Sequence, residues 1–235
     1  MKKFSMLMLI LVAAFAVGSV SAQVLNGQFE NGTDPGSFTT LNAVNNTNID
    51  NWIVDGGNVD YIGNYWLGNG GKSIDLNGFT TGSIHQNLTT VAGITYQVTF
   101  DMSGNPDNPN GSIYPEGHPY FSPADKAMSV TANGVWPQTY HYITGSNSHA
   151  DMQWVSNTFY FTATGSSTSL AFASQIPGAF GPALDNVKVT AITAQICHRD
   201  KGKPGTKTII VGIDAIPAHF AHGDNVTGPC GSTPA

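Results

Sequence analysis

Between residues 83 and 174 the chain repeatedly alternates apolar and polar side chains. Apolar residues at every second position indicate a half-buried β-strand with one face against a core. On this basis strands are predicted at residues 83–88, 95–102, 127–132, 152–162 and 168–174. Turn-forming pairs such as Asn77-Gly78 and Asn133-Gly134 punctuate the chain, and no stretch before residue 194 has helical spacing. The pattern predicts an all-β fold, either a sandwich or a barrel.

Two further segments bracket this region. Residues 25–30 and residues 181–189 each read as a short strand that carries one acidic residue beside a turn. They are candidates for the first and last strands of the fold. Residues 106–123 are rich in proline and show no alternation, so we interpret them as a long surface loop. Residues 23–194 are enough for one sandwich with its own core.

The N-terminus has the order of a secretory signal peptide. Lys2 and Lys3 precede an apolar run from residue 4 to residue 17, and small residues stand before Gln23. The alternative is a retained membrane anchor, but the run is shorter than the roughly 20 residues that a span needs. We therefore expect residues 1–22 to be removed. The mature protein is expected to be secreted or held at the cell surface, with no membrane span.

Charge and composition narrow the class of partner. Without Lys2 and Lys3 the chain keeps 7 basic and 15 acidic residues, a net charge of −8. An acidic protein is a poor partner for nucleic acid, whose binding depends on Lys and Arg at the phosphates. Charged residues make up only 10% of the chain, while apolar and aromatic residues are ample. This composition is typical of an exported β-protein with many turns and not of a disordered chain.

An ordered set of short motifs resembles a known family. The motifs are Asn26–Glu30, Ile49–Trp52, Gly57–Ile62, Ser73–Gly78, Gly82–Gln86, Tyr96–Phe100 and Gly178–Val187. Together they resemble the bacterial choice-of-anchor C family and, more distantly, the plant cell-wall proteins that carry domain of unknown function 642. The resemblance covers roughly residues 24–192. It implies a galactose-binding-like jelly-roll β-sandwich, export, and association with cell-wall or extracellular polysaccharide.

The same resemblance implies a calcium site at Glu30 and Asp185. Related carbohydrate-binding sandwiches hold a structural Ca²⁺ between the first and last strands. Ca²⁺ takes six to eight oxygen ligands, and Glu30, a backbone carbonyl near Gly32 and Asp185 would supply several. The alternative is that Glu30 is a surface charge and Asp185 caps a turn. No other cofactor is expected for the sandwich.

Four aromatic residues are the candidate sugar contacts. A sugar ring needs flat apolar surfaces together with polar groups for its hydroxyls. Tyr65 and Trp66 stand among glycines and asparagines, and Trp136 and Tyr140 stand in a second loop-like stretch. An exposed row of these residues over a cleft would favour sugar binding. The alternative is that they are half-buried without a ligand. Trp52 and Trp154 lie in alternating stretches and are expected in the core.

The chain offers no recognisable catalytic arrangement. It contains neither a Gly-x-Ser-x-Gly motif nor a phosphate-binding glycine loop. A glycosidase would need two carboxylates across the scissile bond. The available acids, whose spacing distinguishes no pair, are Asp55, Asp60, Asp75, Asp101 and Asp151. We therefore expect a protein that is not an enzyme.

Residues 195–235 differ in character and are interpreted as a small C-terminal module. Cys197 and Cys230, the two cysteines of the chain, bracket it, and export favours a disulfide between them. His219 and His222 would share one face of a helical turn, with Asp224 close by. Such a set could bind Zn²⁺ or Cu²⁺. The alternatives are cysteine thiolates as metal ligands, or a disulfide with histidines that bind no metal.

Taken together, these features predict a secreted, non-catalytic protein that attaches to cell-wall or extracellular polysaccharide. The partner would be a polysaccharide or a cell-surface glycan. A structural or adhesive surface protein with a protein partner is the competing hypothesis. A flat apolar patch would favour that alternative. A third possibility is a metal-sequestering tail on an inert scaffold.

Overall fold

The computed structural model describes residues 22–43, 48–107, 115, 118, 121–133, 135–200, 205–225 and 229–231. The signal peptide predicted at residues 1–22 lies outside these ranges except for its last residue. The predicted loop at 106–123 lies partly outside them. None of the helices in the described ranges is long and apolar enough to cross a membrane.

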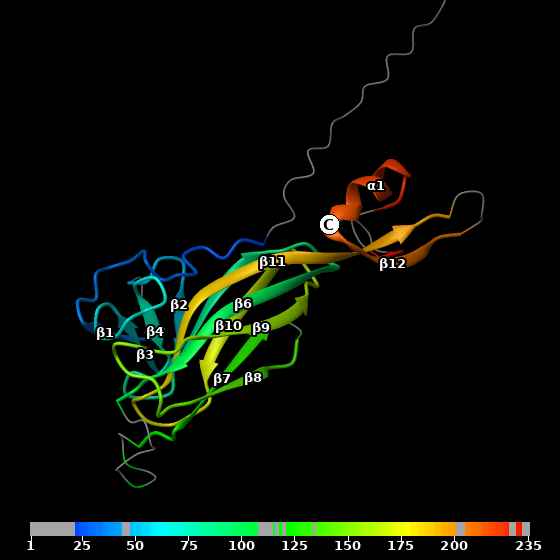
Figure 1. Ribbon diagram of the computed structural model, residues 1–235. Coiled ribbons are helices and arrows are strands. Elements are labelled where there is room, and N and C mark those ends of the chain that lie inside the picture. Colours follow the sequence, from blue (N-terminus) through cyan, green and yellow to red (C-terminus); the bar gives the residue numbers. More distant parts are fainter. Residues whose placement is uncertain are drawn as a thin grey trace, which may run out of the picture.

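The described residues form two antiparallel sheets that pack face to face (Figure 1). The larger sheet contains, in order, β1 (Phe38–Asn42), β3 (Asn58–Ile62), β4 (Ser73–Asp75), β11 (Pro182–His198), β6 (Ile94–Gly104) and β9 (Val155–Thr162). The smaller sheet contains β2 (Ile53–Gly56), β5 (Ser83–Thr89), β10 (Ser167–Ser174), β7 (Asp125–Ala132) and β8 (Gln138–Ile143). The chain crosses repeatedly from one sheet to the other.

Alternation along the strands builds the core between the sheets. In β6 and β10 every second side chain is buried, as the sequence pattern requires. Phe100 of β6 meets Phe172 of β10 across the core, with ring centroids 5.3 Å apart. The five strands predicted from alternation all form, as β5, β6, β7, β9 and β10, with ends shifted by at most three residues. The prediction of an all-β sandwich is confirmed.

The prediction of a first strand at residues 25–30 is wrong, because this segment is irregular. Asn26 and Phe29 adopt positive φ angles of 55° and 57°, which a strand does not allow. The Asn26 amide holds the bend by donating to the carbonyls of Asn31 and Asp50. Local side-chain hydrogen bonds therefore replace the sheet ladder here.

The irregular segment nevertheless lies against the last strand of the sandwich. Val187 N donates a hydrogen bond of 2.8 Å to the Gly27 carbonyl. A Cβ atom on Gly27 would stand 2.0 Å from the Val187 oxygen, so this close approach requires glycine. The first and last segments of the fold are thus in contact, although the first is not a strand.

Strand β11 continues without a break through residue 194, the predicted boundary of the C-terminal module (Figure 1). Its last residues pair with β12 (Lys207–Gly212), which leads into a 3₁₀ turn (Ile213–Ala215) and α1 (Ile216–Ala221). Ile196 and Ile216 are buried in the same cluster as the sandwich core. Cys197 and Cys230 form the predicted disulfide, which excludes them as thiolate ligands.

Candidate functional site

A cleft opens where β1 and β3, at one end of the larger sheet, meet several loops. Its volume is about 160 Å³. It is lined by Phe38, Thr40, Asp60, Ile62, Tyr65, Trp66, Gly78, Phe79, Asn105, Asp107, Ala179 and Phe180. Segments distant in the sequence therefore build one concave surface, with both apolar and acidic side chains.

Three of the aromatic rings that line the cleft are those of Phe38, Tyr65 and Phe79. Phe79 and Phe38 are 61% and 43% exposed, so both rings are accessible to a ligand. Tyr65 lies beside Phe38, with ring centroids 5.1 Å apart, and donates a hydrogen bond of 2.8 Å to Asp107 Oδ2. His149 packs on Tyr65 and its Nε2 lies 2.7 Å from Asp107 Oδ1. Burial and the Asp107 contact raise the pKa of Tyr65 to about 12, so its hydroxyl stays neutral at neutral pH.

Asp60 is an acidic group of the cleft whose pKa is raised by burial. Thr40 Oγ1 donates a hydrogen bond of 2.5 Å to its Oδ1. Desolvation by burial raises the pKa of Asp60 from 3.8 to about 6, and the Thr40 hydrogen bond offsets only part of this. At neutral pH the carboxylate is therefore ionised in surroundings that disfavour its charge. A group of this kind in a cleft is a candidate functional position.

A second carboxyl group, that of Asp75, lies opposite Asp60 in the β3–β4 ladder. It is fully buried and accepts hydrogen bonds from Asn105 Nδ2 and from the backbone N–H groups of Asn77 and Gly181. Burial, together with the nearby Asp60 charge, raises the pKa of Asp75 well above its ordinary value. These hydrogen bonds tie three loops together, so Asp75 holds the cleft in shape.

The exposed Phe79 stands on a tightly held turn between β4 and β5. Asn58 Oδ1 accepts hydrogen bonds from Phe79 N at 2.7 Å and Thr80 N at 3.0 Å. A Cβ atom on Gly78 would come within 2.8 Å of both Asn58 Oδ1 and the Thr40 methyl group. The Asn77-Gly78 pair predicted the turn, but not that the following phenylalanine would be exposed at a cleft. Phe38 carried no sequence signal for such a role.

The predicted sugar contacts divide between two ends of the sandwich. Tyr65 and Trp66 both line the cleft. Trp66, however, is only 3% exposed, and its Nε1–H donates a hydrogen bond to Ser73 Oγ. The prediction that its ring is exposed is therefore wrong. Trp136 is 90% exposed in the turn that follows β7. The cleft lies near the start of β7, because Lys126 Nζ in that strand donates a hydrogen bond to the carbonyl of Phe180, a cleft residue. Six strand residues separate that point from the end of β7, about 20 Å. Trp136 therefore does not share the cleft.

Tyr140 lies on strand β8 and not in the predicted loop. Its ring meets Phe100 edge-on, with centroids 5.0 Å apart. Its hydroxyl donates a hydrogen bond of 2.6 Å to the carbonyl of Thr158 on β9. Since β8 and β9 belong to different sheets, Tyr140 joins the two sheets at their edge. The exposed row of Tyr65, Trp66 and Trp136 over a single cleft, which would have favoured sugar binding, does not form.

Glu30 and Asp185 are neighbours, as the calcium hypothesis requires. Asp185 is buried, and burial raises its pKa to about 7, with further contributions from the charges of Glu30 and Asp101. Both Asp185 oxygens already accept backbone N–H groups, those of Asn186 and Asn69. Glu30 Oε1 accepts the backbone N–H of Lys72, and the Lys72 ammonium donates to the Glu30 carbonyl at 3.0 Å. A Ca²⁺ ion bound at that carbonyl would have to displace the ammonium.

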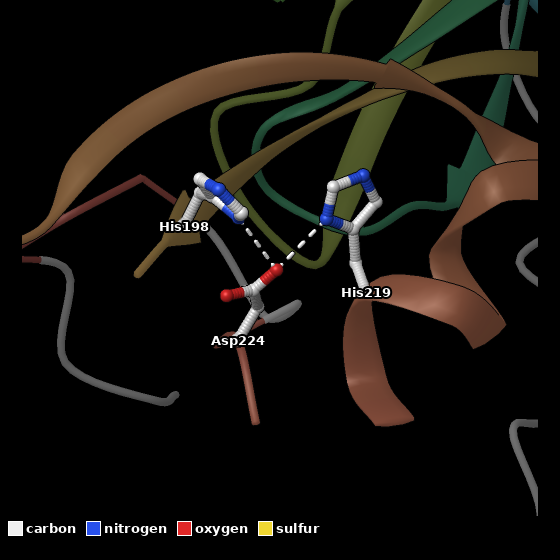
Figure 2. A group of neighbouring side chains, drawn as sticks. All are labelled: His198, His219 and Asp224. Atoms are coloured by element: carbon white, nitrogen blue, oxygen red, sulfur yellow. Dashed lines mark hydrogen bonds and ion pairs between the residues drawn. The ribbon is translucent and has the colours of Figure 1, made fainter. Parts of the chain in front are cut away.

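The C-terminal module, residues 195–235, places two histidines beside one carboxylate (Figure 2). Asp224 Oδ2 lies 2.8 Å from His198 Nδ1 and 2.8 Å from His219 Nδ1. The pKa of Asp224 is held well below its usual range, mainly by the hydrogen bond from the Arg199 backbone N–H and next by the hydrogen bond with His198. His222 caps α1 and is exposed; the three-residue group is His198, His219 and Asp224. The predicted set of His219, His222 and Asp224 is thus changed in one member, because His198 reaches Asp224 from β11.

The fold and the cleft define a two-sheet β-sandwich with a concave site, and comparison with known proteins gives its family. Residues 22–190 match the family described as "Protein of unknown function (DUF642)", so the chain belongs to that family. The sequence also resembles halomucin of Haloquadratum walsbyi, with 36% identity over 195 residues. This match covers 77% of the present chain and 2% of halomucin, so the chain spans only a small part of that protein.

Solved carbohydrate-binding modules show a distant likeness. The module TmCBM61 in complex with β-1,4-galactotriose is 13% identical, with a TM-score of 0.39, covering 72% of this chain and 98% of that one. A family 35 module from Clostridium thermocellum is 11% identical, with a TM-score of 0.40, covering 65% and 98%. At TM-scores below 0.5 these likenesses contribute nothing to the functional argument, which depends on the cleft.

Proposed function

We propose that the protein is a secreted, non-catalytic carbohydrate-binding protein that attaches to cell-wall or extracellular polysaccharide through the cleft of Phe38, Tyr65 and Phe79. The observation that carries the proposal is the pairing of exposed aromatic rings with fixed polar groups in one concave surface. A sugar ring presents C–H groups on its faces and hydroxyls at its edge. The aromatic rings match the faces, and the carboxylate of Asp60 accepts hydrogen bonds from the hydroxyls.

The charges of the cleft favour one class of glycan. Its lining contains the carboxylates of Asp60 and Asp107 and neither lysine nor arginine. An acidic polysaccharide would bring like charges together in a partly desolvated site, which is unfavourable. The expected ligand is therefore a neutral sugar, with hydroxyls that donate to Asp60.

The same geometry supports binding without catalysis. Glycoside hydrolysis by the usual route needs two carboxyl groups with separate roles. Asp107 is occupied at both oxygens, by the Tyr65 hydroxyl and by His149. Asp75 is fully buried. Asp60 is then the single carboxylate of this group that is placed to meet a sugar.

A structural Ca²⁺ ion held by Glu30 and Asp185 belongs to the same proposal. Glu30 and Asp185 are close enough for their charges to interact, and a cation between them would relieve that repulsion. In the structure the Lys72 ammonium donates a hydrogen bond to the Glu30 backbone carbonyl. Export and membership of the choice-of-anchor C family are also proposed; they follow from the sequence of residues 1–22 and from the motifs described above.

Binding of residues 23–235 to a panel of insoluble and arrayed polysaccharides, with and without EDTA, tests the proposal. Phe79→Ala removes an exposed ring from the cleft, and we expect an affinity loss of about tenfold, equivalent to about 1.4 kcal/mol. Trp136→Ala is the matched control, because it removes an exposed aromatic ring that does not line the cleft. Loss of binding in Trp136→Ala alone would move the site to the other end of the sandwich. No binding to any glycan by the folded protein would refute the proposal and favour a protein partner.

A further inference from the structure

The disulfide-linked C-terminal unit holds a side-chain cluster that the proposed cleft does not use. His198 comes from the end of β11, His219 from the last turn of α1, and Asp224 from the segment after α1 (Figure 2). The Asp224 side chain is fully buried, whereas those of His198 and His219 are 18% and 21% exposed. The three ligand atoms lie within 4.8 Å of one another. An ion could therefore reach the cluster past the two histidine rings.

The backbone around the cluster is fixed before any ion binds. Cys197, which precedes His198, is joined to Cys230 by the disulfide. Cys197 also exchanges two backbone hydrogen bonds with Asn225, the residue after Asp224, at 2.8 and 3.0 Å. These links clamp His198 beside Asp224. Arg199 N donates to Asp224 Oδ1 at 2.9 Å, which leaves Oδ2 directed at the two imidazoles.

The second nitrogen of His198 provides the observation that points to a metal. His198 Nε2 lies 3.1 Å from Asp200 Oδ1, so it must carry a hydrogen to make this contact favourable. In neutral imidazole the other nitrogen, Nδ1, then has the lone pair, and it faces Asp224 Oδ2. Metal-binding histidines commonly donate their non-ligating N–H to a carboxylate in this way. The arrangement of Asp200, His198 and the Asp224 carboxylate thus matches that of a histidine ligand with its supporting acid.

We propose that His198 Nδ1, His219 Nδ1 and Asp224 Oδ2 form a Zn²⁺ site with a fourth position open to water. Imidazole nitrogens and a carboxylate oxygen are ordinary Zn²⁺ ligands at about 2.0–2.2 Å. Tetrahedral placement at those distances needs ligand atoms about 3.3 Å apart, so the present 2.8 Å contacts must open by about 0.5 Å. Each Nδ1 must offer its lone pair to Zn²⁺, so any hydrogen that a ring carries at Nδ1 is released to solvent, or is carried at Nε2 instead, when the ion binds.

Zn²⁺ titration of the untagged chain, residues 23–235, by calorimetry tests the site. We expect one Zn²⁺ per chain. His198→Asn and His219→Asn keep a side-chain N–H that can donate to Asp224 but remove the imidazole ligand, and each should weaken binding by more than about 100-fold. Asp200→Asn should weaken it by about tenfold, because the supporting carboxylate is lost. Thermal unfolding without metal should stay close to that of the wild type and so exclude misfolding.

His222→Asn is the matched control, since it removes an exposed histidine three residues from His219. It should change Zn²⁺ affinity by less than about threefold, within the scatter expected outside the ligand set. Nitrogen chemical shifts of the histidine rings should show ligation through Nδ1 at His198 and His219. The proposal is overturned if the wild type binds no stoichiometric Zn²⁺, if His198→Asn binds as tightly as the wild type, or if His222→Asn is the variant that loses the ion.

Discussion

Replacing Asp60 with asparagine should stabilise the protein at neutral pH and weaken glycan binding at the same time. The carboxylate is partly buried in the cleft, and its described hydrogen bond comes from the Thr40 hydroxyl. Asparagine keeps an oxygen that can accept this bond but carries no charge. The substitution therefore removes the desolvation penalty and leaves the packing of β1 against β3 in place.

The magnitude follows from the pKa of Asp60. It is about 6 in the folded protein against 3.8 in an unfolded chain. Each unit corresponds to about 1.4 kcal/mol, so ionisation of Asp60 at pH 7 costs the folded state about 3 kcal/mol at most. The folded state binds a proton at Asp60 more tightly than the unfolded state does. Protonation of Asp60 therefore stabilises the fold fully below pH 3.8, and this stabilisation is lost as the pH rises through about 6. Asp60→Asn should raise the free energy of unfolding by about 1–3 kcal/mol at pH 7. The gain is smaller than the full cost of the charge because the amide is also partly desolvated.

Thermal unfolding at pH 4 and pH 7 measures this effect. For a domain of this size a gain of 2 kcal/mol raises Tm by about 4–8 °C. At pH 4 the difference between the variant and the wild type should shrink, since most wild-type Asp60 is then protonated. Asp50→Asn is the control, because it neutralises an exposed carboxylate. Equal Tm gains at both pH values, or a loss at pH 7, would refute the reasoning.

Two other substitutions test the region where the first and last segments meet. Gly27→Ala should destabilise the protein by more than about 2 kcal/mol in denaturant unfolding, because the new Cβ would collide with the Val187 carbonyl. Gly165→Ala is the control, because Gly165 has open space around it, and it should change the free energy of unfolding by less than about 0.5 kcal/mol. Lys72→Met frees the Glu30 carbonyl, so added Ca²⁺ should raise Tm more in this variant than in the wild type. An identical Tm in Ca²⁺ and in EDTA for both proteins would argue against the calcium site.

The sandwich could be predicted from the sequence because its signal is local. A strand with one buried face alternates at every second residue, and this period was readable in β5, β6, β7, β9 and β10. The short strands β1 to β4 lack a clear period; β4 is three residues long and buried on both faces. The prediction of a strand at residues 25–30 was wrong for a different reason. Its conformation depends on hydrogen bonds from Asn26 to partners up to 24 residues away, which no local pattern shows.

The cleft could be predicted only in part, since exposure depends on tertiary packing. Tyr65 and Trp66 were identified from their loop-like surroundings, yet only Tyr65 has its ring beside the exposed Phe38, while Trp66 packs inward against Ser73. Trp136 looked equivalent in sequence but follows the opposite end of β7. In the C-terminal module, helical spacing paired His219 with His222, and Asp224 was added because it is close in the sequence. His198 was not part of this set, because the pairing that brings β11 to Asp224 is long-range.

Three acids on the neighbouring strands β3, β4 and β11, of which Asp75 and Asp185 are buried and Asp60 is partly buried, differ in how their carboxylates are held. Asp75 accepts three hydrogen bonds from separate loops, and both oxygens of Asp185 are occupied by backbone N–H groups. These two acids organise the backbone around them. Asp60 is held by one hydroxyl and its charge lowers stability at neutral pH. A residue that costs the fold free energy and lines a cleft with exposed aromatic rings is best explained by what it binds, since stability and function commonly compete at such positions.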